Sequence, residues 1–463
     1  MGEYVRRRET GGSGDLSTAL LKADNLADLA DPAAARTSLG LGAAATKSMA
    51  QVAADPALLG TYGRRGASVV VSASNTQNGT AADYVCTGTA DQDTIMAAIA
   101  SLPTAGGKVL LRAGQYNLTA PVVIARDNVT LEGEGFGFWG QFGSGNPGTG
   151  TEGSGITKLK VTAATAYGIF IDGGINSPAE GRWRGITIRG LYLYGVNNTG
   201  TGIVTSASGA HDQVIITECF VHKFGIGMDV KLDAGHISKN MIMDCSGNGL
   251  VMRGDTYTTV YDNCIADIGG DGIVLSGGSE YVITGNVIVR TAKGIYVAAT
   301  VTDVMIANNK LNGCRSHGIH TLGSGTMVQG CDIRNGTGGL GIFGDTSHRI
   351  QVIGNTITGQ TGGEAIGASS GATIYHGVFV GNVVDVAGTA GYDGIHINNM
   401  IGGVVQGNMV GLSSGSNAKT GIWVGGTCGE IAVTGNCVRS SWGTKGTIAT
   451  GSPVNVVGSN VGF

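Results

Sequence analysis

The strongest constraint on the fold is the regular return of one polar residue. Asn recurs at a spacing of 23 residues over six positions, of which the fifth is Asp: Asn240, Asn263, Asn286, Asn309, Asp332 and Asn355. The series continues at wider spacing with Asn382, Asn408, Asn436 and Asn460. A fixed period of this length is typical of solenoids, in which each repeat stacks on its neighbours.

Each repeat follows the same pattern around its Asn. Near Asn286, apolar Tyr281 and Ile283 precede it, Ile288 follows, and a Gly-Ile-x-apolar segment begins at Gly294. This pattern predicts three short strands per repeat, with side chains alternating between core and surface. Helical repeats tolerate far less glycine than 83 in 463 residues, and a propeller blade needs about 40 residues. We therefore expect an all-β coil of three strands per turn, paired in parallel with the turns above and below.

The recurrent Asn has a physical role in such a coil. At a tight bend between two strands it tolerates a left-handed backbone. Its amide can also bond to the rungs above and below and so satisfy buried polar groups. We expect Asp332 to weaken this ladder locally.

The sequence divides into three parts. Residues 1–60 are rich in Ala, Leu and Asp and predict short helices, while residues 61–90 are polar and predict a linker. An amphipathic helix is expected at 91–102, at the start of a β-helix spanning 91–463 with regular rungs from about residue 210. This organisation resembles the pectate-lyase-like right-handed parallel β-helix superfamily, in which a short helix caps the first turn. That superfamily includes lyases, hydrolases, epimerases and inert adhesins, so the resemblance implies a fold rather than an activity.

The N-terminal part carries a second resemblance. Residues 25–42 read Asn-Leu-Ala-Asp-Leu-Ala-Asp-Pro-Ala-Ala-Ala-Arg-Thr-Ser-Leu-Gly-Leu-Gly. This segment resembles the N-terminal part of bacteriophage tail fibres and tailspikes. The resemblance implies a virion tail protein made in the host cytoplasm, attached through residues 1–60 to tail or baseplate proteins. It also implies a homotrimer, which would give the short helices partners. The alternative is an Ala-rich helical linker.

Charge and cysteine content argue against several classes of protein. With 29 basic and 33 acidic residues and no long basic run, a nucleic-acid partner is not expected. No apolar stretch approaches the roughly 18 residues of a membrane helix, and the N-terminus does not resemble a secretory signal. The eight cysteines form no CxxC pair and are interpreted as buried thiols in a reducing compartment. We expect no metal and no cofactor.

Rings recur at the outward position of the Gly-Ile-x-apolar strand. This column comprises Val251, Val274, Tyr296, His320, Phe343, His396 and Trp423. Aromatic faces stack on the apolar faces of sugars, and an elongated surface suits a polymer. The predicted substrate-binding residues are therefore Tyr296, His320, Phe343, His396, Trp423 and, from a neighbouring column, Arg290. Equally, the rings could bury one protomer against another.

Candidate acids lie beside the ladder. Asp244 and Asp267 each follow a ladder position by four residues, and His222 precedes them by one turn if Glu218 occupies the ladder position. Carboxylates one rung apart would be about 5 Å from each other, near the separation in retaining glycosidases, and their repulsion would raise one pKa. Asp271, at the start of the outward strand, is a third candidate catalytic acid. The alternative is a solvated turn that carries Asp for local hydrogen bonds.

Two further features each combine charged and aromatic side chains. Asp393 lies beside His396 as an acid–imidazole pair, and Arg182-Trp183-Arg184 could recognise an anionic sugar. Together these features predict a tailspike that binds and cleaves bacterial surface polysaccharide as a glycoside hydrolase or lyase. A non-catalytic tail fibre and a bacterial polysaccharide lyase or epimerase are the alternatives. The sugar and the host stay open.

Overall fold

The computed structural model describes most of the chain after residue 66. The described residues are 67–136 except 78, 155–172 except 163–166, and 182–461 except 208–209, 346–347, 369–372, 388–390, 415–416, 440–441 and 449–455. The predicted helical segment at 1–60, with its tail-like motif, lies outside them.

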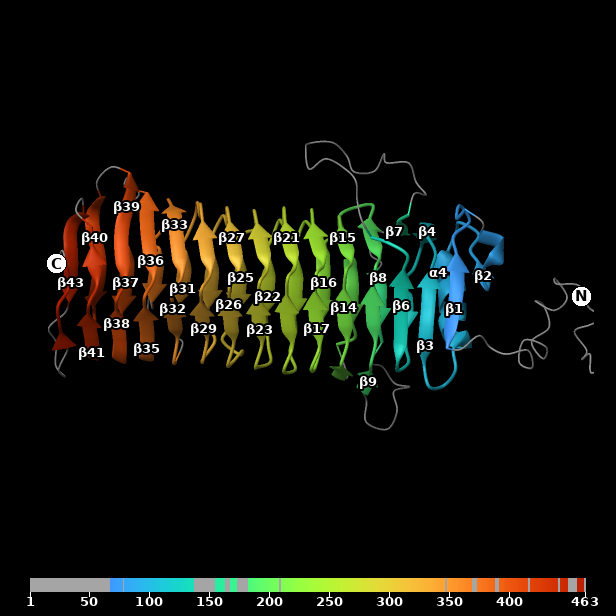
Figure 1. Ribbon diagram of the computed structural model, residues 1–463, viewed down its shortest axis with the longest axis horizontal. Helices are drawn as coiled ribbons and strands as arrows, with labels where there is room; N and C mark the ends of the chain where they lie inside the picture. The colour runs from blue at the N-terminus through green and yellow to red at the C-terminus, as the bar shows by residue number, and fades with distance from the viewer. Residues whose placement is uncertain are drawn as a thin grey trace, which may run out of the picture. The chain divides into compact units, whose positions relative to one another are not determined.

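The chain winds through three long sheets in turn (Figure 1). Sheet A contains β2 (Tyr84–Val85), β1 (Ser68–Ser72), β3 (Gly107–Leu111), β6 (Val129–Gly133), β10 (Thr187–Arg189), β14 (Ile215–Thr217), β17 (His236–Ser238), β20 (Thr259–Tyr261), β23 (Val282–Thr284), β26 (Met305–Ala307), β29 (Met327–Gln329), β32 (Gln351–Ile353), β35 (Ile374–Val380), β38 (Met400–Gln406), β41 (Gly429–Thr434) and β44 (Val456–Val457). Sheet B contains β4 (Gly114–Leu118), β7 (Thr157–Val161), β11 (Tyr192–Gly195), β15 (Phe220–His222), β18 (Met241–Met243), β21 (Cys264–Ala266), β24 (Val287–Val289), β27 (Lys310–Asn312), β30 (Asp332–Arg334), β33 (Thr356–Gln360), β36 (Val383–Ala387), β39 (Met409–Ser414) and β42 (Cys437–Val438).

Sheet C completes each turn of the coil. It contains β5 (Val122–Ile124), β8 (Tyr167–Ile171), β12 (Thr201–Thr205), β16 (Ile226–Val230), β19 (Leu250–Met252), β22 (Ile273–Leu275), β25 (Ile295–Val297), β28 (Ile319–Thr321), β31 (Ile342–Gly344), β34 (Ile366–Ala368), β37 (Ile395–Asn398), β40 (Asn417–Gly425) and β43 (Trp442–Ile448). A separate two-stranded sheet pairs β9 (Arg182–Arg184) with β13 (Ala210–Asp212). Neighbouring strands pair in parallel, one turn apart in the chain. The fold is a right-handed parallel β-helix, as the sequence predicted.

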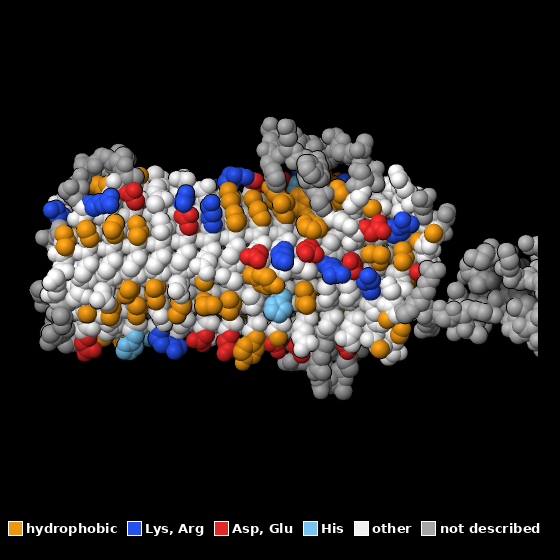
Figure 2. Space-filling view, in the orientation of Figure 1, with side chains coloured by type: hydrophobic (Ala, Val, Ile, Leu, Met, Phe, Trp, Pro, Cys, Tyr) orange, Lys and Arg blue, Asp and Glu red, His pale blue; other side chains and the backbone are white. Residues whose placement is uncertain are grey.

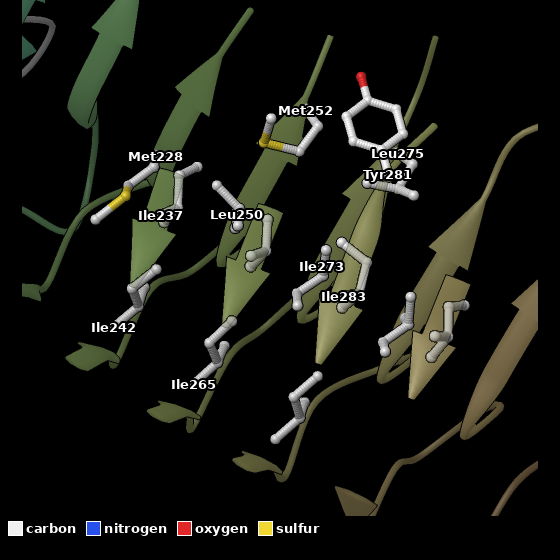
Figure 3. Packing of buried hydrophobic residues seen from close by; sticks show 14 of the residues in the cluster. Met228, Ile237, Ile242, Leu250, Met252, Ile265, Ile273, Leu275, Tyr281 and Ile283 are labelled. Carbon is white, nitrogen blue, oxygen red and sulfur yellow. The ribbon is translucent and has the colours of Figure 1, made fainter. Parts of the chain in front are cut away.

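The interior is filled by stacked aliphatic side chains, one column or two from each sheet (Figure 3). In one turn, Ile237 from sheet A, Ile242 from sheet B, and Leu250 and Met252 from sheet C are fully buried. The same positions in the next turn are Val260, Ile265, Ile273 and Leu275. Because strand residues alternate between the two faces, a three-residue strand can bury either its middle residue or both ends.

The Gly-Ile signature marks a place where successive turns approach closely. A Cβ atom at Gly294 would lie 2.5 Å from the carbonyl oxygen of Gly318 and 2.2 Å from a methyl carbon of Leu311. The equivalent Gly318 faces the carbonyl of Gly341 in the same way, at 2.4 Å. Glycine therefore permits the close contact at which these turns enter sheet C, and Ala365 takes the equivalent position before Ile366.

The predicted asparagine ladder is present at the corner between sheets A and B. The amide of Asn240 donates to Oδ1 of Asn263 at 3.0 Å, and Asn263 donates in turn to Asn286 at 2.9 Å. Each Oδ1 also accepts the backbone N–H of the preceding ladder residue. These Asn residues are buried, so the ladder satisfies polar groups that water does not reach.

Two details of the ladder differ from the prediction. Cys331, and not Asp332, occupies the fifth position, because the N–H of Cys331 donates to Oδ1 of Asn355. Cys219 likewise takes the position assigned to Glu218, donating its N–H to Asn240. Strict 23-residue counting failed because the turns next to Cys331 have slightly different lengths.

The left-handed backbone at this corner belongs to the residue before each Asn. Lys239 and Asp262 have φ of 54° and 55°, and the equivalent Gly354 has φ of 62°. The ladder Asn residues are not in this conformation. Glycine often precedes the Asn because it adopts a left-handed backbone without steric cost.

A single α-helix, α4 (Asp91–Ser101), occurs in the described part of the chain, where the sequence predicted a capping helix. A 3-10 turn spans Gly79–Ala81. Strands β1 and β2 belong to sheet A although the sequence placed residues 61–90 in a linker, since β1 pairs with β3. Stacked turns also precede residue 210. No described helix is long and apolar enough to cross a membrane.

Candidate functional site

The outward face of sheet C carries the predicted column of rings. Successive strands place Tyr296, His320 and Phe343 in direct register, and His396 pairs with Trp423 two turns further on. Gly367 occupies the intervening turn, which the sequence analysis did not recognise. We call Tyr296, His320, Phe343, His396 and Trp423 the ring column.

The rings of this column contact one another across the turns. The ring centroids of Tyr296 and His320 lie 5.3 Å apart, and those of His320 and Phe343 lie 5.0 Å apart. Beyond Gly367, His396 and Trp423 are stacked at 4.1 Å. All five side chains are half-buried, so each keeps part of its surface open to solvent. The column thus forms two aromatic patches on one face of the coil.

A second column runs beside the rings, three residues earlier in each turn. This flanking column comprises Asp271, Lys293, His317, Leu340, Glu364 and Asp393. Lys293 places Nζ 4.6 Å from the ring centroid of Tyr296, and His317 stacks on His320 at 4.8 Å. Charged and apolar groups therefore adjoin along the same face, as in surfaces that bind sugars.

His320 lies at the centre of the first patch. Neither ring nitrogen has a hydrogen-bond partner within the described residues, and both nitrogens are buried. Burial lowers the pKa of His320 to about 4, and the charges of His317 and Lys293 act in the same direction. The imidazole is consequently neutral at physiological pH and acts as a flat stacking surface.

The second patch contains an acid–imidazole group. Nδ1 of His396 lies 2.7 Å from Oδ2 of Asp393, while Oδ1 of Asp393 accepts the backbone N–H of Thr420 at 2.8 Å. Burial by itself would raise the pKa of Asp393, but the hydrogen bonds from His396 and Thr420 lower it overall. Glu364 from the preceding turn brings a second carboxylate, and one donor atom from each of the three residues lies within 4.8 Å of the other two.

The three predicted catalytic acids do not lie together. Asp244 and Asp267 occupy adjacent turns at the end of sheet B, where both have a left-handed backbone (φ of 54° and 57°). The chain has left the strand there, as the sequence predicted. Asp271 instead belongs to the flanking column at the start of sheet C.

Each of these acids also has a partner. Asp267 forms a bidentate ion pair with the predicted substrate-binding residue Arg290, and Asp271 faces Lys293 at 3.4 Å. Asp244 accepts a hydrogen bond from Nε2 of His222 at 2.8 Å. The mutual repulsion expected between unpaired carboxylates is therefore offset by cations and imidazole.

The sequence analysis missed two participants in these groups. The hydroxyl of Tyr192 lies 3.0 Å from Nδ1 of the buried His222, so Tyr192, His222 and Asp244 form one hydrogen-bonded chain. Burial lowers the pKa of His222, although Asp244 opposes this shift. Glu364 was also missed, yet it precedes Ile366 by two residues, as Asp393 precedes Ile395 and Asp271 precedes Ile273. The side chains of Arg182, Trp183 and Arg184 lie outside the described residues.

Comparison with known families supports the fold. Residues 148–326 match the family described as right handed beta helix region, and residues 281–391 match the family described as periplasmic copper-binding protein (NosD). No curated protein sequence matches the chain.

Solved structures give the same result. The A-module of the mannuronan C-5 epimerase AlgE6 from Azotobacter vinelandii is 18% identical with a TM-score of 0.54, covering 80% of this chain and 94% of its own. A mutant DFA-IIIase from Arthrobacter chlorophenolicus A6, in complex with DFA-III, is 14% identical with a TM-score of 0.51, covering 84% and 98%. The Dettilon tailspike protein is 17% identical, covering 79% and 64%, and its TM-score of 0.48 is too low to carry an argument. At these identities the likeness shows the β-helix fold alone.

Proposed function

We propose that this protein binds a polymeric glycan along the outward face of sheet C. The observation that carries the proposal is the ring column, whose half-buried rings lie in register along the coil axis. Neighbouring turns are about 4.8 Å apart, so a chain of sugars lying along the axis would pass over several rings. Aromatic faces contribute both area and orientation in such contacts. The names of the epimerase and the DFA-IIIase that share this fold refer to carbohydrate substrates, which supports a glycan as the ligand class.

The finer proposal is a bacteriophage tailspike that binds and cleaves bacterial surface polysaccharide. Its support is the sequence of residues 25–42, which resembles tail-fibre and tailspike N-termini. On this proposal residues 1–60 attach a homotrimer to the phage tail. A non-catalytic tail fibre would use the same face without cleavage, and a bacterial lyase or epimerase would lack the tail attachment.

Cleavage requires an acid that can reach a glycan on the ring column. Among the predicted acids, Asp271 belongs to the flanking column, whereas Asp244 and Asp267 lie at the sheet B end of the turn. Lys293 joins Asp271 to the ring of Tyr296. Asp271 is therefore the predicted catalytic residue best placed for the chemistry.

The experiment measures binding to bacterial capsular polysaccharides, mannuronan and fructan on a glycan array, together with release of oligosaccharides. Trp423→Ala and Tyr296→Ala should each weaken binding about tenfold, equivalent to roughly 1.4 kcal/mol. Tyr257→Asn is the matched control, because Tyr257 is an exposed ring (63%) between β19 and β20 and is not part of the ring column. Unchanged binding in both ring variants would overturn the proposed site.

Cleavage is tested separately from binding. Asp271→Asn should abolish release of oligosaccharides while leaving binding largely intact. If a variant with Asn at positions 244, 267 and 271 still cleaved its glycan, all three acids would be eliminated as catalytic residues. Binding without any release by the unmodified chain would favour the non-catalytic tail fibre.

A further inference from the structure

The second aromatic patch brings two carboxylates and an imidazole together, the one such group of potential metal ligands among the described residues. Eight carboxylates in the described residues have a Lys or Arg partner within ion-pair distance: Glu132, Glu134, Asp229, Asp255, Asp267, Asp271, Asp303 and Asp332. Glu364 and Asp393 have no Lys or Arg within ion-pair distance in the described residues, although the charge of Lys419 acts on Asp393, and the two acids meet at the imidazole of His396. Two carboxylates this close repel each other unless a positive charge lies between them.

We propose that Glu364, Asp393 and His396 bind one divalent transition-metal ion, of which Zn²⁺ is the best fit. Three atoms no more than 4.8 Å apart all lie within about 2.8 Å of a common point, and zinc bonds are roughly 2.0–2.2 Å. Small side-chain rotations would therefore bring all three donors onto one ion. Imidazole nitrogen favours Zn²⁺ over Ca²⁺ and Mg²⁺, which prefer oxygen ligands alone.

Two of the three donors are already oriented by other groups. The backbone N–H of Thr420 holds one oxygen of Asp393 and leaves Oδ2 facing the site. The ring of His396 is stacked on Trp423 at 4.1 Å, which restricts its rotation. Such outer contacts are the usual support of metal ligands, because they reduce the ordering needed on binding. The Asp393 side chain is only 11% exposed and the His396 side chain 31%, so both donors are largely shielded from solvent.

The site gains its charge balance from the metal. In the metal-free protein the bond between His396 and Asp393 needs a proton on one of them. A bound ion takes the place of this hydrogen bond and lies next to the Glu364 carboxylate, so its charge balances that of both acids.

The test uses the full chain, stripped with chelator and titrated with Zn²⁺ by calorimetry and with Co²⁺ by visible absorption. We expect one ion per chain, with affinity lowered at least tenfold in Glu364→Gln and in Asp393→Asn. His396→Phe should abolish binding of the ion. Glycan binding by the stripped parent chain and by the same chain loaded with Zn²⁺, measured side by side, separates failure of the metal site from failure of the proposed glycan site.

Asp244→Asn is the matched control. Asp244 and His222 form an acid–imidazole pair whose hydrogen bond, at 2.8 Å, is nearly as short as that between Asp393 and His396. This pair does not belong to the group of potential metal ligands. The Zn²⁺ affinity of this variant should equal that of the parent. Measured without metal, the variants of the three proposed ligands should keep the melting temperature of the parent. Equal losses in Asp244→Asn and Asp393→Asn would overturn the proposal, as would absence of Zn²⁺ binding or tighter binding of Ca²⁺ than of Zn²⁺.

Discussion

A single histidine shows how burial determines the chemistry of the sheet C face. His320 lies between His317, Tyr296 and Phe343, and no described group donates to or accepts from its nitrogens. The residue type suggests an acid–base group, whereas the surroundings make it an aromatic surface. Residue identity alone therefore overstates the catalytic potential of this column.

The same burial predicts that acid destabilises the protein. The pKa of His320 is about 4 in the folded protein and near 6.5 in the unfolded chain, so below pH 6.5 only the unfolded chain takes up the proton. Stability contributed by neutral His320 should be fully present above pH 6.5 and lost as the pH falls towards 4. Allowing for partial solvent access, the loss between pH 7 and pH 5 is of order 1 kcal/mol.

Urea denaturation at several pH values measures this effect. His320→Phe keeps a ring in the stack and removes the titrating group, so its midpoint should vary less with pH than that of the parent. Parallel pH profiles for the two proteins would contradict the prediction.

At the scale of elements, the corner between sheets A and B is organised by the amide ladder. The ladder runs from Asn240 to Asn309, is interrupted at Cys331, and continues from Asn355 to Asn460. At the interruption the amide of Asn309 still donates to the carbonyl oxygens of Ile283 and Ala307, but its acceptor in the next turn is the sulfur of Cys331 at 4.0 Å in place of an Asn oxygen. Sulfur is a weak acceptor, so this corner is less well satisfied than its neighbours.

Completing the ladder should stabilise the coil. Cys331→Asn would supply Oδ1 to Asn309 and is expected to add about 1 kcal/mol to the free energy of unfolding. Asn286→Ala would instead leave the backbone N–H of Asn263 without its acceptor and remove one acceptor of the Asn263 amide, at a cost of roughly 3 kcal/mol. Thermal and urea denaturation measure both changes, with Asn312→Ala in sheet B as a control outside the ladder. A lower midpoint for Cys331→Asn would show that packing around the thiol outweighs the gain in hydrogen bonding.

At the scale of the whole molecule, the outer faces of the coil differ in character. Apolar side chains form bands along sheets A and B, and the band on sheet A is nearly continuous (Figure 2). Val287, Met305, Val383 and Met409 are each about two-fifths exposed. Exposed apolar surface of this extent is a common property of subunit contacts. The bands give the proposed homotrimer a contact surface that leaves the ring column on sheet C open.

Sedimentation equilibrium of the full chain tests the assembly. Three chains of 46.7 kDa correspond to a particle of about 140 kDa. Met305→Glu should lower the association constant, since it places a charge on the sheet A band, whereas Trp423→Ala should leave it unchanged. A particle with the mass of one chain would contradict the homotrimer, and dissociation caused by Trp423→Ala would place the ring column in the subunit contact.

The sequence by itself determined the parts of this protein that depend on local repetition. The coil, its three strands per turn, the Asn corner and the outward position of the rings follow from alternation and period, which each turn repeats. The capping helix, predicted at 91–102 and observed at Asp91–Ser101, follows from the helical spacing of its apolar residues. Only the tertiary structure decided which side chains meet between turns. Because the turns vary in length, counting residues assigned the fifth ladder position to Asp332 although Cys331 occupies it. For the same reason, counting did not show that Glu364 adjoins Asp393 and His396. The ion pair between Asp267 and Arg290 was also visible only in the tertiary structure, because the two residues lie in neighbouring turns of the coil.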